Sequence, residues 1–388
     1  MTAGLSRRAA ICGIGQTEFS KESGRTELQL ACECVKAALD DAGLSPADVD
    51  GLVTFTMDTT EEIDVVRNLG IGELSVFSRV PYGGGAAAGT VLQAAMAVAT
   101  GVADVVVCYR AFNERSGMRF GGFASTLTSM PLFLSWYGPY GLLTPASWVA
   151  LHARRYMETY GVTNADFAPI AVVDRKHAAT NPDAWFHGRP ITVEDHQSSR
   201  WIVEPVLRLL DCCQESDGGV AIVVTSTERA RDLRQVPAVI EAAAQGATFD
   251  GESMTSYYRD DLTGLQEMGA VARRLWSMSG LSPADIQTAF LYDHFTPFVL
   301  MQLEELGFCG RGEAKEFATV ENLSIGGRLP INTNGGLLGE AYIHGMNGIT
   351  EGVRQVRGTS HNQVDAVEHV LVTSGTGVPT SGLILGRA

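Results

Sequence analysis

Apolar residues along this chain fall into two patterns, which alternate from the first residues to the last. Residues 26–42 place Leu28, Val35 and Leu39 on one side of a helical period, and this pattern predicts a helix. Residues 9–13 and 103–109 are continuous apolar runs, typical of strands that are buried on both faces. Residues 87–100 are mostly small and predict a buried helix that packs closely against its neighbours. The alternation predicts an α/β fold.

A seven-residue phrase occurs twice and indicates that this fold is duplicated. The sequence GLSPADV at residues 43–49 returns as GLSPADI at residues 280–286. Each copy follows a helical stretch and precedes an apolar run, so each predicts a helix, a capped turn and a strand in that order. We interpret the chain as two copies of one α/β unit. The predicted domains are residues 1–235, with an insertion at about 112–200, and residues 236–388.

The second half repeats the order of elements found in the first. The pattern predicts a strand at 218–226 before the boundary, then helices at 265–278, 295–306 and 341–357, a strand at 286–292, and a closing hairpin from 367–373 and 382–385. The insertion is rich in aromatic residues between positions 112 and 146, among them Phe120, Phe123, Phe133, Trp136, Tyr137 and Tyr140. These aromatics are expected either to pack as ordinary core or to face a substrate or a partner.

Composition excludes several classes of protein. The chain has 388 residues and a net charge of -15, which argues against a broad nucleic-acid surface. Its seven cysteines are odd in number and have no zinc-like spacing, so we expect neither a disulfide framework nor a metal site. No apolar run is long enough to cross a bilayer. We therefore expect a cytoplasmic protein that does not bind membranes or nucleic acid.

Several motifs together identify a family resemblance that covers nearly the whole chain. They are the turn GVADVVV at 101–107, DGGVA at 217–221, YDHF at 292–295, Gly335-Gly336 followed by YIHG at 342–345, and SGTG at 374–377. The chain resembles the thiolase superfamily, and within it the branch of lipid-transfer proteins, also called the sterol-carrier-protein thiolase-like branch. The resemblance implies a thiolase fold, with two βαβαβαββ halves in a five-layered α/β/α/β/α sandwich.

The chain departs from thiolases at all four positions where their catalytic groups stand. Alignment with the family places the nucleophilic cysteine at Gly84 and the second cysteine in the segment Thr373-Ser374. The residue that opens the box before Phe295 is Tyr292, and the histidine of the family's Gly-His-Pro motif is replaced by Tyr342. Claisen chemistry through a thioester on the enzyme needs a thiolate. Ordinary thiolase activity is therefore expected to be absent.

The two tyrosines resemble the pattern of the steroid side-chain aldolases of cholesterol-degrading actinobacteria. That resemblance implies retro-aldol cleavage of 17-hydroxy-3-oxo-pregnene-20-carboxyl-CoA to androstenedione and propionyl-CoA. CoA is then part of the substrate, and no cofactor or metal is expected in this chain. The resemblance also implies a homodimer that binds a DUF35 protein, with an OB fold and a zinc ribbon, in an α2β2 heterotetramer.

Retro-aldol cleavage requires a base for the β-hydroxyl, a donor for the enolate and an acid for the α-carbon. We expect Tyr292 and Tyr342 to serve as base and acid, in an order that the sequence leaves open. An unperturbed tyrosine has a pKa of about 10, too high for an efficient base. We expect Asp293, His294 and His344 to assist, for example through a cationic histidine that lowers the pKa of a phenol or through a proton relay.

Glycines are expected to bring backbone donors to the enolate oxygen. The amides of Gly375 and Gly377 are one candidate set. Gly84 and Gly85 at the start of the buried helix are another, because free amides and the helix dipole favour an anion there. Glycine in place of the thiolase cysteine is also expected to make room for a bulky ring system.

Two other interpretations stay open at this point. The chain could be a thiolase-like scaffold that binds an acyl-CoA or a lipid without chemistry. It could also be an acyltransferase that uses another cysteine, such as Cys309, Cys212 or Cys213. Loss of the thiolase cysteine fits the aldolase and the scaffold equally. Two phenols at lost catalytic positions favour the aldolase, since a binding protein has no need of them.

Overall fold

A large mixed sheet with helices on both faces forms the framework of the chain. The structure is a computed structural model that describes residues 4–119, 132–252, 256–377 and 380–388. The strands are β1 (Ala9–Gln16), β2 (Gly51–Phe55), β3 (Val76–Val80), β4 (Val105–Asn113), β5 (Trp201–Val203), β6 (Leu207–Arg208), β7 (Asp217–Ser226), β8 (Ala238–Gly246), β9 (Thr288–Phe290), β10 (His369–Ser374) and β11 (Thr380–Arg387). Among the described residues, nine strands form one sheet in the order β3-β2-β4-β7-β1-β8-β11-β10-β9, and β5 and β6 form a separate pair.

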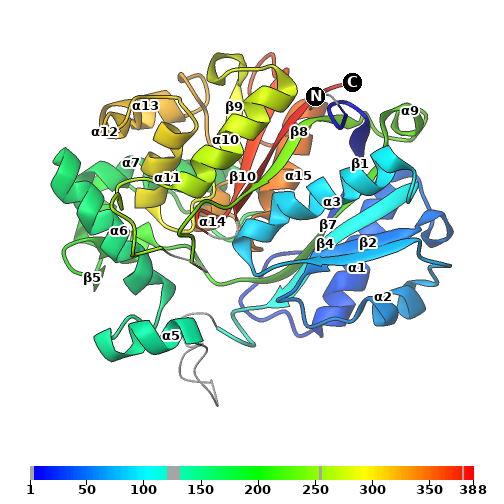
Figure 1. The fold of residues 1–388 in the computed structure, drawn as a ribbon, viewed down its shortest axis with the longest axis horizontal. Coiled ribbons are helices and arrows are strands. Elements are labelled where there is room, and N and C mark those ends of the chain that lie inside the picture. The colour runs from blue at the N-terminus through cyan, green and yellow to red at the C-terminus, as the bar shows by residue number, and fades with distance from the viewer. Residues whose placement is uncertain (1–3, 120–131, 253–255, 378–379) are drawn as a thin grey trace.

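Helices cover this sheet and connect its strands (Figure 1). The longer ones are α1 (Glu27–Ala42), α2 (Glu62–Leu69), α3 (Ala87–Thr100), α6 (Pro145–Tyr160), α7 (Ala168–Thr180), α10 (Gln266–Ser279), α11 (Thr296–Glu305) and α15 (Met346–Arg357). The shorter ones are α5 (Leu132–Tyr137), α8 (Val193–Ser198), α9 (Thr227–Ala230), α12 (Ala314–Phe317), α13 (Val320–Leu323) and α14 (Gly336–Gly339).

The two halves of the sheet enclose a central helical layer. Helix α3 packs against β2, β4 and β7 of the first half and against β8 and β11 of the second, and α15 packs on β9, β10 and β11. Helix α1 covers the outer face of the first half, and α10 covers that of the second. Strands β1 and β8 pair antiparallel through Ala10–Val239 and Ile11–Ala238, and this pairing joins the halves. The five layers of the expected thiolase fold are confirmed.

The duplicated phrase forms the same local structure in both halves. Helices α1 and α10 end at Gly43 and Gly280, which take left-handed conformations with φ of 76° and 73°. Each is followed by a short 3₁₀ turn with a reciprocal capping box, between Ser45 and Asp48 in the first copy and between Ser282 and Asp285 in the second. Strands β2 and β9 follow. The chain therefore uses one capped connection twice, and each copy leads into the next strand of its half.

The insertion between β4 and β7 contributes α5 to α8. Phe120 and Phe123 of the aromatic segment lie outside the described residues, as does the side chain of Phe133. Of the remaining aromatics, Tyr137 is buried, whereas Trp136 and Tyr140 are exposed. Tyr137 packs edge-on against Tyr257 and donates to Glu252. This part of the insertion is therefore anchored to the second half of the chain by one aromatic residue.

Candidate active site

The hydroxyl groups of Tyr292 and Tyr342 meet, and they form the centre of the candidate site. Their oxygen atoms lie 2.9 Å apart, and the ring centroids are separated by 6.3 Å. Tyr292 follows β9 and is only 2% exposed, while Tyr342, between α14 and α15, is partly exposed. The shared position expected for these two phenols is therefore observed, and a ligand can approach the pair from the side of Tyr342.

Polar side chains form hydrogen bonds with the backbone of both tyrosines. The amide of Tyr292 donates to Thr373 Oγ1 at 2.9 Å and to Gln302 Oε1 at 3.2 Å, and Gln302 Nε2 donates back to the Tyr292 carbonyl at 2.9 Å. The amide of Tyr342 donates to Ser216 Oγ at 3.2 Å. Because these partners are buried, the phenols are held by a rigid frame.

The Tyr292 phenol fills the space beside Gly84. A Cβ atom built on Gly84 would overlap the hydroxyl oxygen and the adjoining ring carbon of Tyr292. The expectation that glycine here makes room for a bulky substrate ring is therefore wrong, because the protein's own phenol takes that room. The Tyr292 hydroxyl lies where a side chain at position 84 would project.

Burial raises the pKa of both phenols well above the ordinary value for tyrosine. The nearby Glu114 and Cys213 raise the pKa of both further. The hydrogen bond between the two hydroxyls works in opposite directions, lowering the pKa of Tyr292 and raising that of Tyr342. Both groups are therefore protonated at neutral pH, and the pair can pass a proton along but holds no resting phenolate.

The neighbouring histidines are neutral, which corrects the expectation of a cationic helper. Burial lowers the pKa of His294 to about 3 and lowers that of His344 well below its usual value, with the charge of Arg110 adding to the effect on His344. The His294 ring lies 4.8 Å from that of Tyr292, and the His344 ring lies 5.0 Å from that of Tyr342. Neither imidazole therefore carries the positive charge at neutral pH that would lower the pKa of a phenol. Burial in a low dielectric disfavours the charged form of every group, so it keeps the phenols protonated and the imidazoles neutral.

Asp293 faces the start of α14 instead of the two phenols. Its carboxylate accepts hydrogen bonds from the amides of Leu337 at 2.8 Å and Leu338 at 3.0 Å. Burial raises its pKa to about 6, and burial together with the nearby Asp293 raises the pKa of Asp174 well above its usual value. A Cβ atom on Gly336 would overlap the carboxylate, so the glycine turn is shaped around it. Asp293 therefore holds the start of the segment that leads to Tyr342, and its part in catalysis stays a prediction.

Comparison with known proteins places the chain in a family. Residues 246–387 match the family model described as thiolase C-terminal domain-like. The chain is 69% identical over 386 residues to a steroid side-chain-cleaving aldolase from Thermomonospora curvata, covering 98% of each chain. It is equally identical to a 17-hydroxy-3-oxo-4-pregnene-20-carboxyl-CoA lyase from Mycobacterium tuberculosis, covering 98% of this chain and all of that one. The chain belongs to the steroid side-chain-cleaving aldolases of the thiolase superfamily.

Solved structures agree with this membership. A structure described as an Ltp2-ChsH2(DUF35) aldolase matches with a TM-score of 0.94 at 68% identity, covering 99% of this chain and 98% of that one. Human mitochondrial 3-ketoacyl-CoA thiolase matches with a TM-score of 0.68 at 14% identity, covering 99% of each chain, which shows the shared fold alone. The thiolase-superfamily framework is thus retained, while the chemistry at its centre differs in this aldolase branch.

Serine hydroxyls cap the helix that carries the nucleophile in thiolases. The amides of Ala88 and Gly89 in α3 donate to Ser374 Oγ at 3.2 Å and Ser381 Oγ at 3.0 Å. Ser381 also donates to the carbonyl of Gly85 at 2.7 Å. These helix amides are therefore already bonded within the protein. Anion binding by the amides of Gly84 and Gly85, or by those of Gly375 and Gly377 after β10, stays a prediction.

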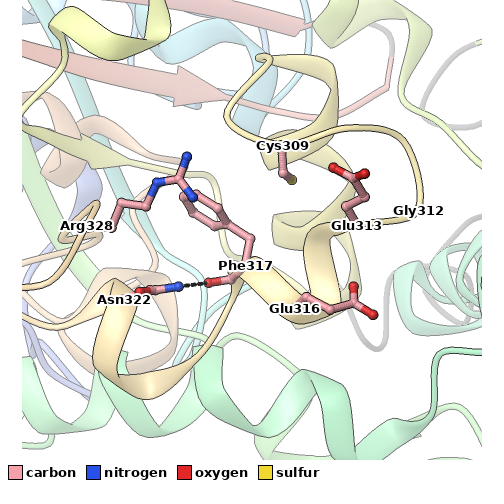
Figure 2. Close-up of a pocket in the computed structure, with 7 residues that line it drawn as sticks. All are labelled: Cys309, Gly312, Glu313, Glu316, Phe317, Asn322 and Arg328. Atoms are coloured by element: carbon pink, nitrogen blue, oxygen red, sulfur yellow. Dashed lines mark hydrogen bonds between the residues drawn. The ribbon is translucent and has the colours of Figure 1, made fainter.

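The cysteines of this aldolase-branch member are poor nucleophiles. Burial raises the pKa of Cys213 well above its usual value, and that of Cys212 is raised in the same way. Cys309 lines a separate pocket of about 480 Å³ beside Glu313 and Glu316 (Figure 2). Burial and the nearby Glu304 raise its pKa to about 12. Thiolate chemistry is disfavoured at all three positions.

Replacing Cys309 with Ser is expected to leave cleavage within about twofold of the unmodified enzyme, since a partly exposed residue outside the site has little effect. Product release by the two proteins, assayed side by side before and after iodoacetamide treatment, checks this. A loss of activity that follows alkylation in the unmodified protein and is absent in the Cys309→Ser variant would instead point to a cysteine mechanism.

Gln302, which holds Tyr292 through its backbone, had no signal in the sequence, because no motif indicates a contact of that kind. Thr373 was noted only as part of the segment that replaces the second thiolase cysteine, and its hydrogen bond with the Tyr292 amide was not predicted. Arg110 is different, because it interrupts an otherwise apolar strand, β4, and is completely buried. A charged residue in a buried strand is uncommon unless it has a partner, so this position was a readable signal.

Two further findings bear on the expected class of protein. Among the described residues, no group of three or more His, Cys, Asp or Glu side chains is arranged to hold a metal ion. No helix in the described part of the chain has the length and apolar character needed to cross a membrane. The predicted absence of a cofactor and the predicted cytoplasmic location stay predictions.

Proposed function

We propose that this chain cleaves the side chain of a steroid acyl-CoA by a retro-aldol reaction. The substrate is 17-hydroxy-3-oxo-pregnene-20-carboxyl-CoA, and the products are androstenedione and propionyl-CoA. Membership in the family and the names of the two relatives at 69% identity support the reaction. The observation that carries the mechanism is the contact between two protonated phenol hydroxyls at 2.9 Å in place of a cysteine nucleophile.

The two phenols act as a relay in this mechanism. The substrate's tertiary hydroxyl gives its proton to one phenol oxygen as that phenol passes its own proton to the other. The bond between the carbinol carbon and the α-carbon breaks, the carbinol carbon becomes a ketone, and the bonding electrons move toward the thioester as a developing enolate. In the same step the second phenol gives its own proton to the α-carbon as it accepts the proton of the first, so both phenols are neutral before and after cleavage. No phenolate has to exist at rest, which agrees with the raised pKa of both groups.

A relay of neutral phenols predicts a particular dependence of the rate on pH. Both groups stay protonated through neutral pH because burial raises their pKa. The value of kcat/KM should therefore show no unit-slope rise on a logarithmic scale between about pH 7 and 9. A pH series of initial rates at low substrate concentration measures this. A unit-slope increase in that range would show instead that a phenolate is the base.

The partner of this chain is a protein with a DUF35 module. The structural relative at 68% identity is named as an aldolase with such a component, which supports the assignment. We propose the finer arrangement of two copies of this chain with two partner chains, α2β2. The molar mass of the purified complex, from light scattering after gel filtration, distinguishes this stoichiometry from a simple one-to-one complex.

The decisive test of the function is direct. The chain and its DUF35 partner are incubated with a β-hydroxyacyl-CoA that has a tertiary alcohol, and propionyl-CoA and the ketone are measured over time. The same thioester without the hydroxyl serves as the control, and it should bind without cleavage. Equimolar release of the two products is expected. Tight binding of the intact hydroxyacyl-CoA without release would support the scaffold interpretation and contradict the proposal.

A further inference from the structure

Arg110 is a buried cation that contacts the side chains of Asp58 and His344. Its guanidinium is completely buried and forms an ion pair with Asp58 at 3.2 Å. Its Nε donates to His344 Nδ1 at 3.2 Å. Phe112 and Phe55 lie beside the guanidinium at 4.3 and 5.5 Å, and the same two rings flank the imidazole. A buried charge is costly unless every partner is well placed, so this arrangement requires a precise geometry.

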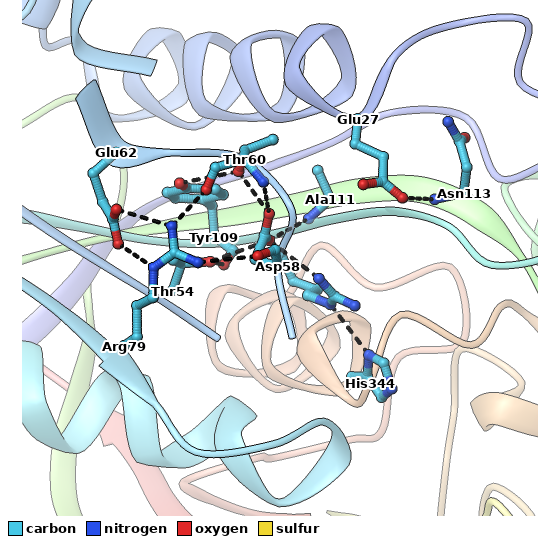
Figure 3. A network of polar contacts seen from close by, with 11 residues as sticks. Glu27, Thr54, Asp58, Thr60, Glu62, Arg79, Tyr109, Ala111, Asn113 and His344 are labelled. Atoms are coloured by element: carbon cyan, nitrogen blue, oxygen red, sulfur yellow. Dashed lines mark hydrogen bonds and ion pairs between the residues drawn. The ribbon is translucent and has the colours of Figure 1, made fainter. Parts of the chain in front are cut away.

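The Asp58 carboxylate is itself held by hydrogen bonds from Thr54 and Thr60 (Figure 3). One carboxylate oxygen accepts from the amide and hydroxyl of Thr60 at 3.0 and 2.6 Å. The other accepts from the Thr54 hydroxyl at 3.2 Å. The chain of contacts runs from Asp58 through Arg110 in the first half to His344 in the second, and all three side chains are buried. Because each member is held in place, the orientation of the imidazole is fixed as well.

This contact determines which nitrogen of His344 carries the proton. The Nε atom of an arginine can only donate a hydrogen bond, so Nδ1 of His344 accepts and is unprotonated. The imidazole is neutral, as shown above, and its single proton is therefore on Nε2. His344 also adopts φ of 52°, a left-handed conformation that is uncommon for a residue with a side chain. Such a strained backbone is typical of positions where a side chain must point in one direction.

The protonated nitrogen points at the segment beside the two phenols. A Cβ atom built on Gly83 would lie 2.7 Å from His344 Nε2, and the next residue, Gly84, is the one against which the Tyr292 hydroxyl packs. The imidazole also lies against the Tyr342 ring. The imidazole therefore lies between Gly83 and the Tyr342 ring, next to the residue that packs against the Tyr292 hydroxyl.

We propose that His344 Nε2–H donates a hydrogen bond to the thioester oxygen as the enolate forms, and that Arg110 and Asp58 are positioning residues that hold it in this tautomer. The inference rests on the proposed function, since a developing enolate is the anion to be stabilised. A neutral donor suits the task, because a charge on the imidazole would require a proton that the buried Arg110 repels. The role differs from that of a proton relay, since His344 keeps its proton throughout.

Two substitutions at this position separate a donor from a structural side chain. His344→Asn tolerates the left-handed backbone but is too short to place a donor at the Nε2 position, whereas the amide of His344→Gln reaches it. We expect His344→Asn to lower kcat by about 10²–10³-fold with little change in KM, and His344→Gln to keep most of the activity. Equal activities in the two variants, or a loss confined to KM, would overturn the proposal.

The tautomer is measured without any assay of activity, in the complex with its partner. Histidine labelled with nitrogen-15 shows which ring nitrogen is protonated, and comparison with His344→Asn assigns the signal among the eight histidines. One Nε2–H tautomer at neutral pH is expected, with a mixture of tautomers in Arg110→Met, which removes the donor to Nδ1. A protonated Nδ1 in the unmodified protein, or a pattern unchanged in Arg110→Met, would overturn the assignment of Arg110. If the wild-type complex cleaves no substrate, the proposed function fails while this measurement still stands.

Discussion

Replacing Tyr342 with Phe is expected to lower kcat for cleavage by about 10²–10⁴-fold, the usual contribution of general acid–base catalysis. The substitution removes one hydroxyl and leaves a ring of the same shape, so the relay is interrupted while packing is preserved. Tyr292→Phe is expected to have an effect of the same order, since its hydroxyl is the other half of the 2.9 Å contact. Initial rates of propionyl-CoA release at saturating substrate measure both variants.

A matched control distinguishes this effect from general damage. Tyr160→Phe also removes a single phenol hydroxyl, one that lies 3.3 Å from Thr263 Oγ1 and away from the pair. Its activity should stay within about twofold of wild type. Thermal unfolding of all three variants reports whether the fold is intact. Cleavage by Tyr342→Phe and Tyr292→Phe at close to the wild-type rate would end the assignment of these residues.

The second large effect is expected at Gly84. In Gly84→Ala the new methyl group would overlap the Tyr292 hydroxyl, and the 3₁₀ turn Gly84–Ala86 leads directly into α3, whose first residues are buried and limit how far the turn can shift. The phenol must therefore move by about 1 Å, a displacement that can reduce the rate by about 10²-fold. We expect kcat to fall accordingly. Gly84→Cys restores the residue type found in thiolases, but it should be equally impaired and gain no thiolase activity.

Gly72→Ala is the control for this experiment. A Cβ atom at Gly72 has no neighbour within 4 Å, so the substitution adds the same methyl group where nothing is displaced. Its cleavage rate and unfolding temperature should match those of the unmodified protein. If Gly84→Ala were as active as Gly72→Ala, the Tyr292 hydroxyl would not occupy the space that the structure assigns to it.

The sequence predicts much of the fold because local signals and tertiary structure agree. The repeated phrase predicted two capped turns, and both form with the same hydrogen bonds. Strand β8 had no counterpart among the expected elements. Its residues 238–246 are rich in alanine, which favours helices, but they lie between β1 and β11 near the middle of the sheet. Pairing on both sides overrides the local preference.

The helix predicted at 341–357 shows a second limit of local patterns. It begins only at Met346, because His344 and Gly345 have positive φ values of 52° and 84° and cannot continue a helix toward the N-terminus. The proposed orientation of His344 depends on this interruption. A pattern of apolar residues does not reveal a positive φ value, so the position of the helix start could not be predicted from it.

At the site, the sequence pointed to two tyrosines whose hydroxyls meet in the structure, but it did not predict their ionisation, and their catalytic role stays a prediction. Residue types and family positions pointed to Tyr292 and Tyr342, and the structure brings their hydroxyls together. The charge state of His294 and His344 depends on burial, which no spacing of residues reveals. The cationic helper expected from sequence is therefore replaced by two neutral imidazoles. Asp293 is adjacent to Tyr292 in the chain, but its carboxylate accepts a hydrogen bond from α14. Residues that are neighbours in sequence can therefore point to different parts of the structure.

A double-mutant cycle on the two tyrosines tests the central idea most directly. If the hydroxyls pass protons along one chain, breaking it at either position has the full effect, and residues that act as a unit are strongly non-additive. Tyr292→Phe, Tyr342→Phe and the double variant should then have similar kcat values. Losses that multiply in the double variant would show that the two phenols act independently and would contradict a shared relay.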